Sequence, residues 1–98
     1  RQGLDLQYIS AQALRLSSKF ISKNCQVNLS HEKATLIWCL KETIFKWHQK
    51  GNIDFINDIK IDPFTISEKG HLVATFKEQK LSLVYERINS HFLVYICK

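Results

Sequence analysis

The sequence predicts a single α+β domain over residues 1–98, with an N-terminal two-helix hairpin packed on one face of a four- to five-stranded antiparallel meander. Three observations support this prediction. Hydrophobic residues recur at helical spacing in the first half of the chain and at alternate positions in the second half. Turn-forming residues separate the alternating stretches about every 8–12 residues. Helices that precede a run of short strands are typical of the α+β class.

The first helix is predicted over residues 4–24. At about 100° per residue, one face of this helix collects apolar side chains, namely Leu6, Ile9, Ala13, Leu16 and Phe20. The opposite face collects polar ones, namely Tyr8, Gln12, Arg15, Lys19 and Lys23. The three cations are spaced four residues apart, which predicts a straight basic stripe along the outside of the helix.

The second helix is predicted to begin after Asn28 or Ser30 and to end near Lys50, with Gly51 as the stop signal. Its apolar residues cover roughly 200° of the helical wheel. Such a helix must be covered on two sides, so we expect it to lie between the first helix and the sheet.

Five strands are predicted after the second helix, over residues 53–61, 64–67, 72–76, 81–87 and 92–97. Asp62-Pro63 and the "EKG" stretch at 68–70 are turn signals between them. Three acidic residues, Asp54, Asp58 and Asp62, are expected on a solvated face of the first of these strands.

The last two strands are predicted to form a hairpin around a two-residue turn at Asn89-Ser90. This register places Tyr85 on the face that meets the helices, and it places Glu86, His91 and Tyr95 together on the open face. Because Asn-Ser is a weaker turn signal than Asn-Gly, a slip of one residue, which would exchange the two faces, is the alternative.

The net charge of +5 lies entirely in the first half, where residues 1–50 hold eight Lys or Arg and three Asp or Glu. The basic stripe is therefore expected either to be a solvated face or to dock on something acidic, namely an acidic protein, a nucleic acid or a membrane surface. The stacking-aromatic pattern of an RNA-binding sheet is absent.

A ribonuclease is the alternative function. Glu86 as base, His91 as acid and Lys77 for charge, with Tyr95 nearby, are residue types that can cleave an RNA phosphodiester. The helix–helix–meander order is similar to that of small ribonuclease toxins such as barnase, and equally to that of cystatin-like binding domains and small secretion or assembly domains. This likeness lies in the order of elements alone, and it implies no residue roles.

The remaining residue types predict no cofactor and no metal. His71 and His91 flank turns that could meet at one end of the sheet, but turn-flanking polar residues are common. Cys25, Cys39 and Cys97 are spaced too widely for a zinc motif. We expect three reduced, mostly buried thiols in a reducing compartment, slightly favouring the cytoplasm, with one disulfide in a periplasmic or secreted protein as the alternative.

The chain contains no Met and begins at Arg1, which suggests a processed chain or a piece of a longer protein. Its longest uncharged apolar stretch is residues 34–40, too short for a membrane span. From these observations we expect a non-catalytic binding or assembly module, which docks through the basic helix face and through the final strand if that strand is an edge, with a homodimer as one outcome.

Overall fold

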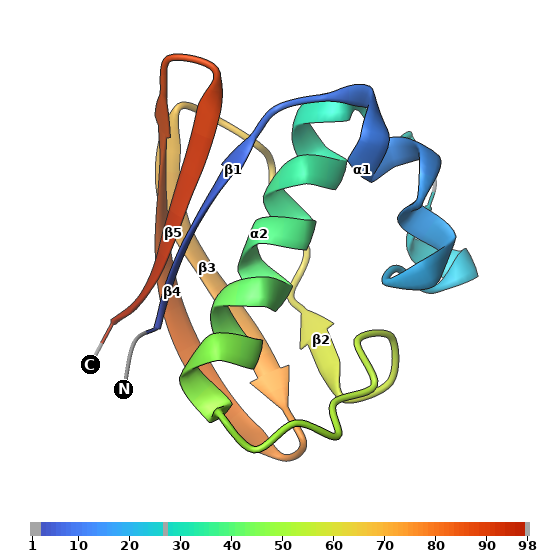
Figure 1. Cartoon of the computed structure of the whole chain (residues 1–98), viewed down its shortest axis with the longest axis vertical. Helices are drawn as coiled ribbons and strands as arrows, with labels where there is room; N and C mark the ends of the chain where they lie inside the picture. The colour runs from blue at the N-terminus through green and yellow to red at the C-terminus, as the bar shows by residue number, and fades with distance from the viewer. Residues whose placement is uncertain (1–2, 27, 98) are drawn as a thin grey trace.

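One long helix and a five-stranded antiparallel sheet make up the computed structural model, which describes residues 3–26 and 28–97. The sheet curves around the helix α2 (His31–His48), as Figure 1 shows. The strands are β1 (Leu4–Tyr8), β2 (Ile59–Ile61), β3 (Lys69–Phe76), β4 (Gln79–Ile88) and β5 (His91–Cys97). Their order across the sheet is β1-β5-β4-β3-β2, and every neighbouring pair is antiparallel.

The predicted N-terminal helical hairpin is wrong. Residues 4–24 contain the edge strand β1, a five-residue helix α1 (Ala11–Arg15) and two short 3-10 turns, η1 (Ser17–Lys19) and η2 (Lys23–Cys25). The serines within residues 4–24 explain why no long helix forms there, because Ser side chains compete for backbone hydrogen bonds and favour helix ends. Ser10 is extended, and its Oγ accepts the Gln12 N–H at 3.3 Å.

The second helix is confirmed. Ser30 is its N-cap, with Oγ accepting the Lys33 N–H at 3.0 Å, and Glu32 lies in its first turn. The helix ends before the predicted Gly51, because Gln49 adopts the left-handed conformation with φ of 62°.

The final hairpin has the predicted register, with Ile88 opposite His91 and Tyr85 opposite Val94. Two other predicted strands are wrong. Residues 64–67 form no strand, and the stretch at 53–58 forms a turn held by the Asp54 carboxylate, so that only Ile59–Ile61 is extended. Hydrogen bonds from Asn57 keep the pKa of Asp54 below its usual value.

The "EKG" stretch is not a loop, since Lys69 and Gly70 already belong to β3. A Cβ built on Gly70 would lie only 3.0 Å from the Tyr85 ring. Tyr85 is buried on the helix side, as predicted, and its hydroxyl accepts the Ser67 N–H at 3.0 Å.

The helix α2 is covered on two sides, as its wide apolar arc predicts. One side packs on the sheet through residues such as Leu36, Leu40 and Ile44. The other side is covered by the short N-terminal elements and the loop before β2, rather than by a long helix. There Trp38 contacts the rings of Phe20 and Phe55, with centroid distances of 5.0 and 5.6 Å.

Candidate strand-binding edge

The strand β1 forms one edge of the sheet and has an open backbone. The Ile96 N–H donates to the Gly3 carbonyl and the Ile9 N–H to the Ser90 carbonyl, both at 2.8 Å. Because hydrogen-bonding direction alternates along an antiparallel strand, the backbone N–H and C=O groups of Leu4, Leu6 and Tyr8 point away from β5. Among residues 3–26 and 28–97, no strand lies on that outer side.

The face of the sheet turned away from α2 is rich in exposed hydrophobic side chains next to this edge. Among the described residues, six large hydrophobic side chains are exposed, and five of them lie on this face: Leu4, Leu6, Tyr8, Ile88 and Tyr95. The strand register makes them neighbours, with Leu4 opposite Tyr95 and Tyr8 opposite His91. The result is an apolar surface over β1 and β5, with His91 and Glu86 lying between it and Ile88 at the end of β4.

The edge strand is held to the helix by an ion pair. Asp5 points inward, is 4% exposed, and its Oδ1 lies 2.5 Å from Lys46 Nζ on α2. Gln7 Nε2 donates to the other carboxylate oxygen at 2.7 Å. The hydrogen bond to Asp5 raises the pKa of Lys46, so the Lys46 ammonium stays charged at neutral pH. The single charge on β1 is therefore already compensated.

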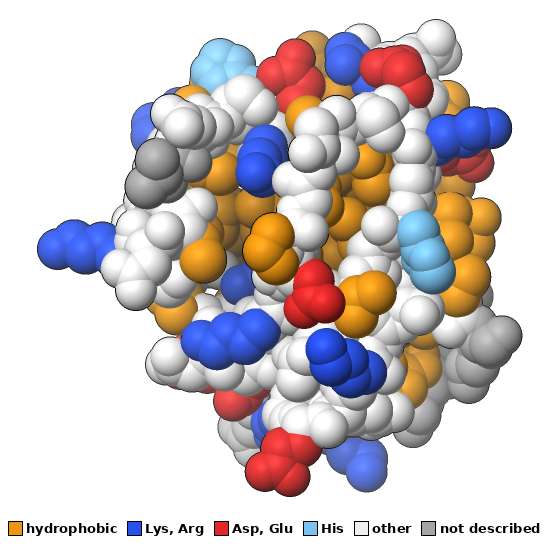
Figure 2. Space-filling model, turned by 180° about the vertical axis from the view of Figure 1, so that it is seen from behind, with side chains coloured by type: hydrophobic (Ala, Val, Ile, Leu, Met, Phe, Trp, Pro, Cys, Tyr) orange, Lys and Arg blue, Asp and Glu red, His pale blue; other side chains and the backbone are white. Residues whose placement is uncertain are grey.

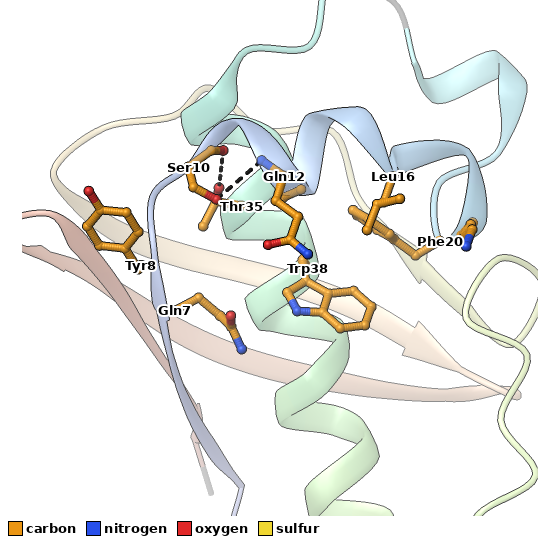
Figure 3. Close-up of a pocket in the computed structure, with 10 residues that line it drawn as sticks. Gln7, Tyr8, Ser10, Gln12, Leu16, Phe20, Thr35 and Trp38 are labelled. Atoms are coloured by element: carbon orange, nitrogen blue, oxygen red, sulfur yellow. Dashed lines mark hydrogen bonds between the residues drawn. The ribbon is translucent and has the colours of Figure 1, made fainter.

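A hydrophobic cleft of about 320 Å³ lies beside β1 on its helix side, between β1, α1 and α2. Figure 3 shows Gln7 on the Trp38 side of β1 and the Tyr8 ring on the other side of the strand. The cleft is lined by Gln7, Tyr8, Ser10, Gln12, Ala13, Leu16, Lys19, Phe20, Thr35 and Trp38. A segment beside β1 would therefore have the apolar sheet face on one side and this cleft on the other.

The five predicted binding residues do not form a stripe, because the helix that would align them does not exist. Tyr8 is on β1, Gln12 and Arg15 are on α1, and Lys19 and Lys23 are in η1 and η2. All five are exposed, and three of them, Tyr8, Gln12 and Lys19, line the cleft beside β1. Sequence reasoning named these three residues but missed the strand and the cleft that bring them together.

The final strand is not an edge, contrary to the docking surface expected there, since β5 is paired with β1 on one side and β4 on the other.

Glu86, His91 and Tyr95 share the open face as predicted. Lys77 lies in the turn between β3 and β4, whereas His91 follows the turn at the other end of β4, roughly 30 Å away along that ten-residue strand. Lys77 is therefore not beside Glu86 and His91.

The ring of Tyr8 lies against that of His91 in an edge-to-face arrangement, with the two centroids 5.5 Å apart. His71 is opposite Val84 and His91 is opposite Ile88, so the two histidines are about 13 Å apart along β4. They do not form the pair that the two turns suggested.

The cysteines are all free, and only Cys39 is buried. Burial, followed by the nearby Asp5 charge, raises the pKa of the Cys39 thiol well above its usual range. The thiol donates towards the Asp5 carbonyl at 3.3 Å and is inert as a nucleophile. Cys25 and Cys97 are exposed, contrary to the expectation of mostly buried thiols.

Within the described part of the chain, no group of His, Cys, Asp or Glu side chains is arranged to hold a metal ion. No helix among those residues is long and apolar enough to cross a membrane.

The fold and its edge define an α+β protein with an open sheet edge beside a hydrophobic cleft. Comparison with protein-family models, curated proteins and solved structures finds no match for the chain.

Proposed function

We propose that the chain is a non-catalytic binding module that takes up an extended segment of a partner protein as a sixth strand beside β1. The observation that carries the proposal is the open edge of β1 with a hydrophobic cleft alongside it. Strand addition of this kind combines main-chain hydrogen bonds with side-chain pockets, so that the edge supplies affinity and the pockets supply specificity.

The free backbone groups of β1 support this mode of binding. Lys, Pro and bulges are common ways to protect an exposed edge, and β1 has none of these; its one inward charge, Asp5, is paired with Lys46. The donors and acceptors of Leu4, Leu6 and Tyr8 match those of an incoming strand in either direction.

The two sides of the edge define the chemistry of the partner segment. Side chains on one face of the added strand would rest beside Leu4, Leu6 and Tyr8, and those on the other face would enter the cleft at Trp38. The proposed partner segment therefore carries apolar residues on both faces near its centre. The basic stripe predicted on a helix over residues 4–24 is not proposed as a docking surface, because that helix does not form.

The experiment uses a library of random twelve-residue peptides selected on the immobilised protein. We expect enriched peptides with β-branched and aromatic residues, and we expect the amide exchange of Leu4, Leu6 and Tyr8 to slow when such a peptide binds. No enrichment above an unrelated immobilised protein would refute the proposal.

Leu6→Pro is the decisive variant. It removes a donor that points away from the sheet, so the fold should persist while peptide binding is lost. Gln7→Pro removes a donor that bonds to β5 and should destabilise the fold instead. Phe45→Ser is a control for the loss of an exposed hydrophobic side chain, because Phe45 lies on α2 and packs against Phe55, and its loss should leave binding unchanged. Equal peptide affinity in Leu6→Pro and wild type would contradict strand addition.

A further inference from the structure

A second cleft, of about 300 Å³, lies away from β1, between α2, the edge strand β2 and the short turn η2. Its lining combines hydrophobic residues, five isoleucines and Phe64 among them, with Lys33, Lys41 and Lys60. Figure 2, which views the molecule from behind, shows hydrophobic and basic side chains together around a hollow on this side.

The inner end of this cleft is formed by a buried lysine. Lys41, in the middle of α2, is only 4% exposed. Its Nζ donates to the carbonyl oxygens of Phe20 at 2.6 Å and Phe55 at 2.5 Å. Among the described residues, no carboxylate forms an ion pair with it. An ammonium has three donors, so two carbonyls leave one donor for a further acceptor and leave the charge without a counterion.

The rest of the cleft is also positively charged. Lys33 and Lys60 line it, and the Lys33 ammonium lies 5.0 Å above the Phe64 ring. The one carboxylate in the lining is Asp62, which already has Lys80 at 3.8 Å. Three ammonium groups therefore surround a space that one shared carboxylate cannot neutralise.

The hydrophobic walls of the cleft limit the kind of anion that can bind there. Five isoleucines, Pro63 and Phe64 form half of the fourteen lining residues, and such walls cannot replace the water of a small, fully polar ion. The volume of about 300 Å³ equals roughly ten water molecules at about 30 Å³ each. A single anionic group on a hydrocarbon body of about ten carbons matches both the size and the polarity.

We propose that this cleft binds a small amphiphilic carboxylate, with its acid group at Lys41 and its hydrocarbon part against the isoleucines. The carboxylate would accept the third donor of Lys41 and supply the missing counterion. The site is independent of the proposed strand-binding edge, because no residue of β1 or α1 lines it.

The electrostatics of the cleft agree with such a ligand. Burial, followed by the charge of Lys60, lowers the pKa of Lys41 to about 8. Cys25 and Asp54 act in the opposite direction but do not restore the ordinary value. A carboxylate beside Lys41 would favour the charged amine and raise this pKa.

The test titrates the full chain with decanoate, below its micellar concentration, and follows isoleucine methyl groups by NMR. We expect saturable shifts at Ile37, Ile59 and Ile61, which line the cleft, and no shift at Ile88 on the open sheet face. Decanol, which has the same chain without the charge, should bind at least about tenfold more weakly.

Lysine-to-methionine variants test which ammonium group binds the carboxylate of decanoate. Lys41→Met keeps the length of the side chain without the ammonium, and it should weaken decanoate binding about tenfold while leaving decanol unaffected. The double variant Lys33→Met, Lys60→Met changes only the outer lysines. If Lys41→Met does not fold, this double variant should still weaken decanoate binding and leave decanol binding unchanged, and an equal loss for both ligands would count against the proposal. Lys69→Met is the control, since Lys69 is an exposed lysine on β3 outside the cleft.

Three results would overturn the proposal. They are equal affinities for decanoate and decanol, shifts at Ile88 as large as those in the cleft, and an equal loss of binding in Lys69→Met. Peptide selection tests the edge strand β1, whereas decanoate titration tests the cleft, so the failure of one proposal does not contradict the other.

Discussion

The buried amine of Lys41 predicts an unusual dependence of stability on pH. Replacing Lys41 by Met removes one titrating group whose pKa is about 8 in the folded protein and 10.5 in the unfolded chain. Between these values the unfolded chain binds more protons than the folded protein does. The free energy of unfolding contributed by Lys41 therefore rises with pH over this range, because stability increases wherever the unfolded state holds more protons.

The magnitude follows from the difference between the two pKa values. At about 1.4 kcal/mol per pH unit, the interval from about 8 to 10.5 corresponds to roughly 3 kcal/mol. We expect wild type to gain this amount relative to Lys41→Met between about pH 7 and pH 11. The groups that face Lys41, namely Lys60, Cys25 and Asp54, are present in both proteins, so their own titrations largely cancel in the difference.

Urea unfolding, followed by tryptophan fluorescence at a series of pH values, measures the difference. Wild type alone would be ambiguous, because the raised pKa of Cys39 acts the other way and lowers stability at alkaline pH. Subtracting the variant removes this contribution. A difference that stays constant with pH, or that falls as pH rises, would refute the buried-ammonium argument.

Three further predictions concern stability and are measured by urea unfolding at neutral pH. Lys46→Met should cost about 1–2 kcal/mol, because it leaves the buried Asp5 carboxylate without its counterion while solvent already screens the half-exposed Lys46; a loss under about 0.5 kcal/mol would show that the pair behaves like a fully exposed one. Gly70→Ala should cost about 1–3 kcal/mol, because the new Cβ would meet the Tyr85 ring at 3.0 Å, and unchanged stability would argue against that close packing. Gln49→Gly should add about 1 kcal/mol by relieving the left-handed conformation at the end of α2, and a loss of stability would contradict this account.

The helix α2 and the final hairpin could be predicted because local rules specify them. Ser30 and Glu32 mark the start of the helix, and an apolar arc covers its two sides. Asn89-Ser90 is a two-residue turn, and the period of two in the flanking strands then determines which residues face each other. The open-face positions of Glu86 and His91 follow from the same two facts.

The strand β1 was missed because residues 4–8 satisfy two periods at once. Leu6 and Ile9 fit a helical face that continues to Ala13, but Leu4, Leu6 and Tyr8 also alternate as a strand does. Pairing with β5, more than eighty residues later in the chain, favours the strand, and the inward Asp5 finds Lys46. No local propensity contains that information.

By itself, the sequence determined the α+β class, the antiparallel sheet, one long helix covered on two sides and the last hairpin, because each follows from periodicity and turn chemistry within a short stretch. Only the tertiary structure decided that β1 is an open edge, that β5 is not one, and that Lys41 is buried at the inner end of a cleft. Both proposed binding sites join segments that are distant along the chain. Their positions depend on long-range packing, which the pattern of any single segment does not specify.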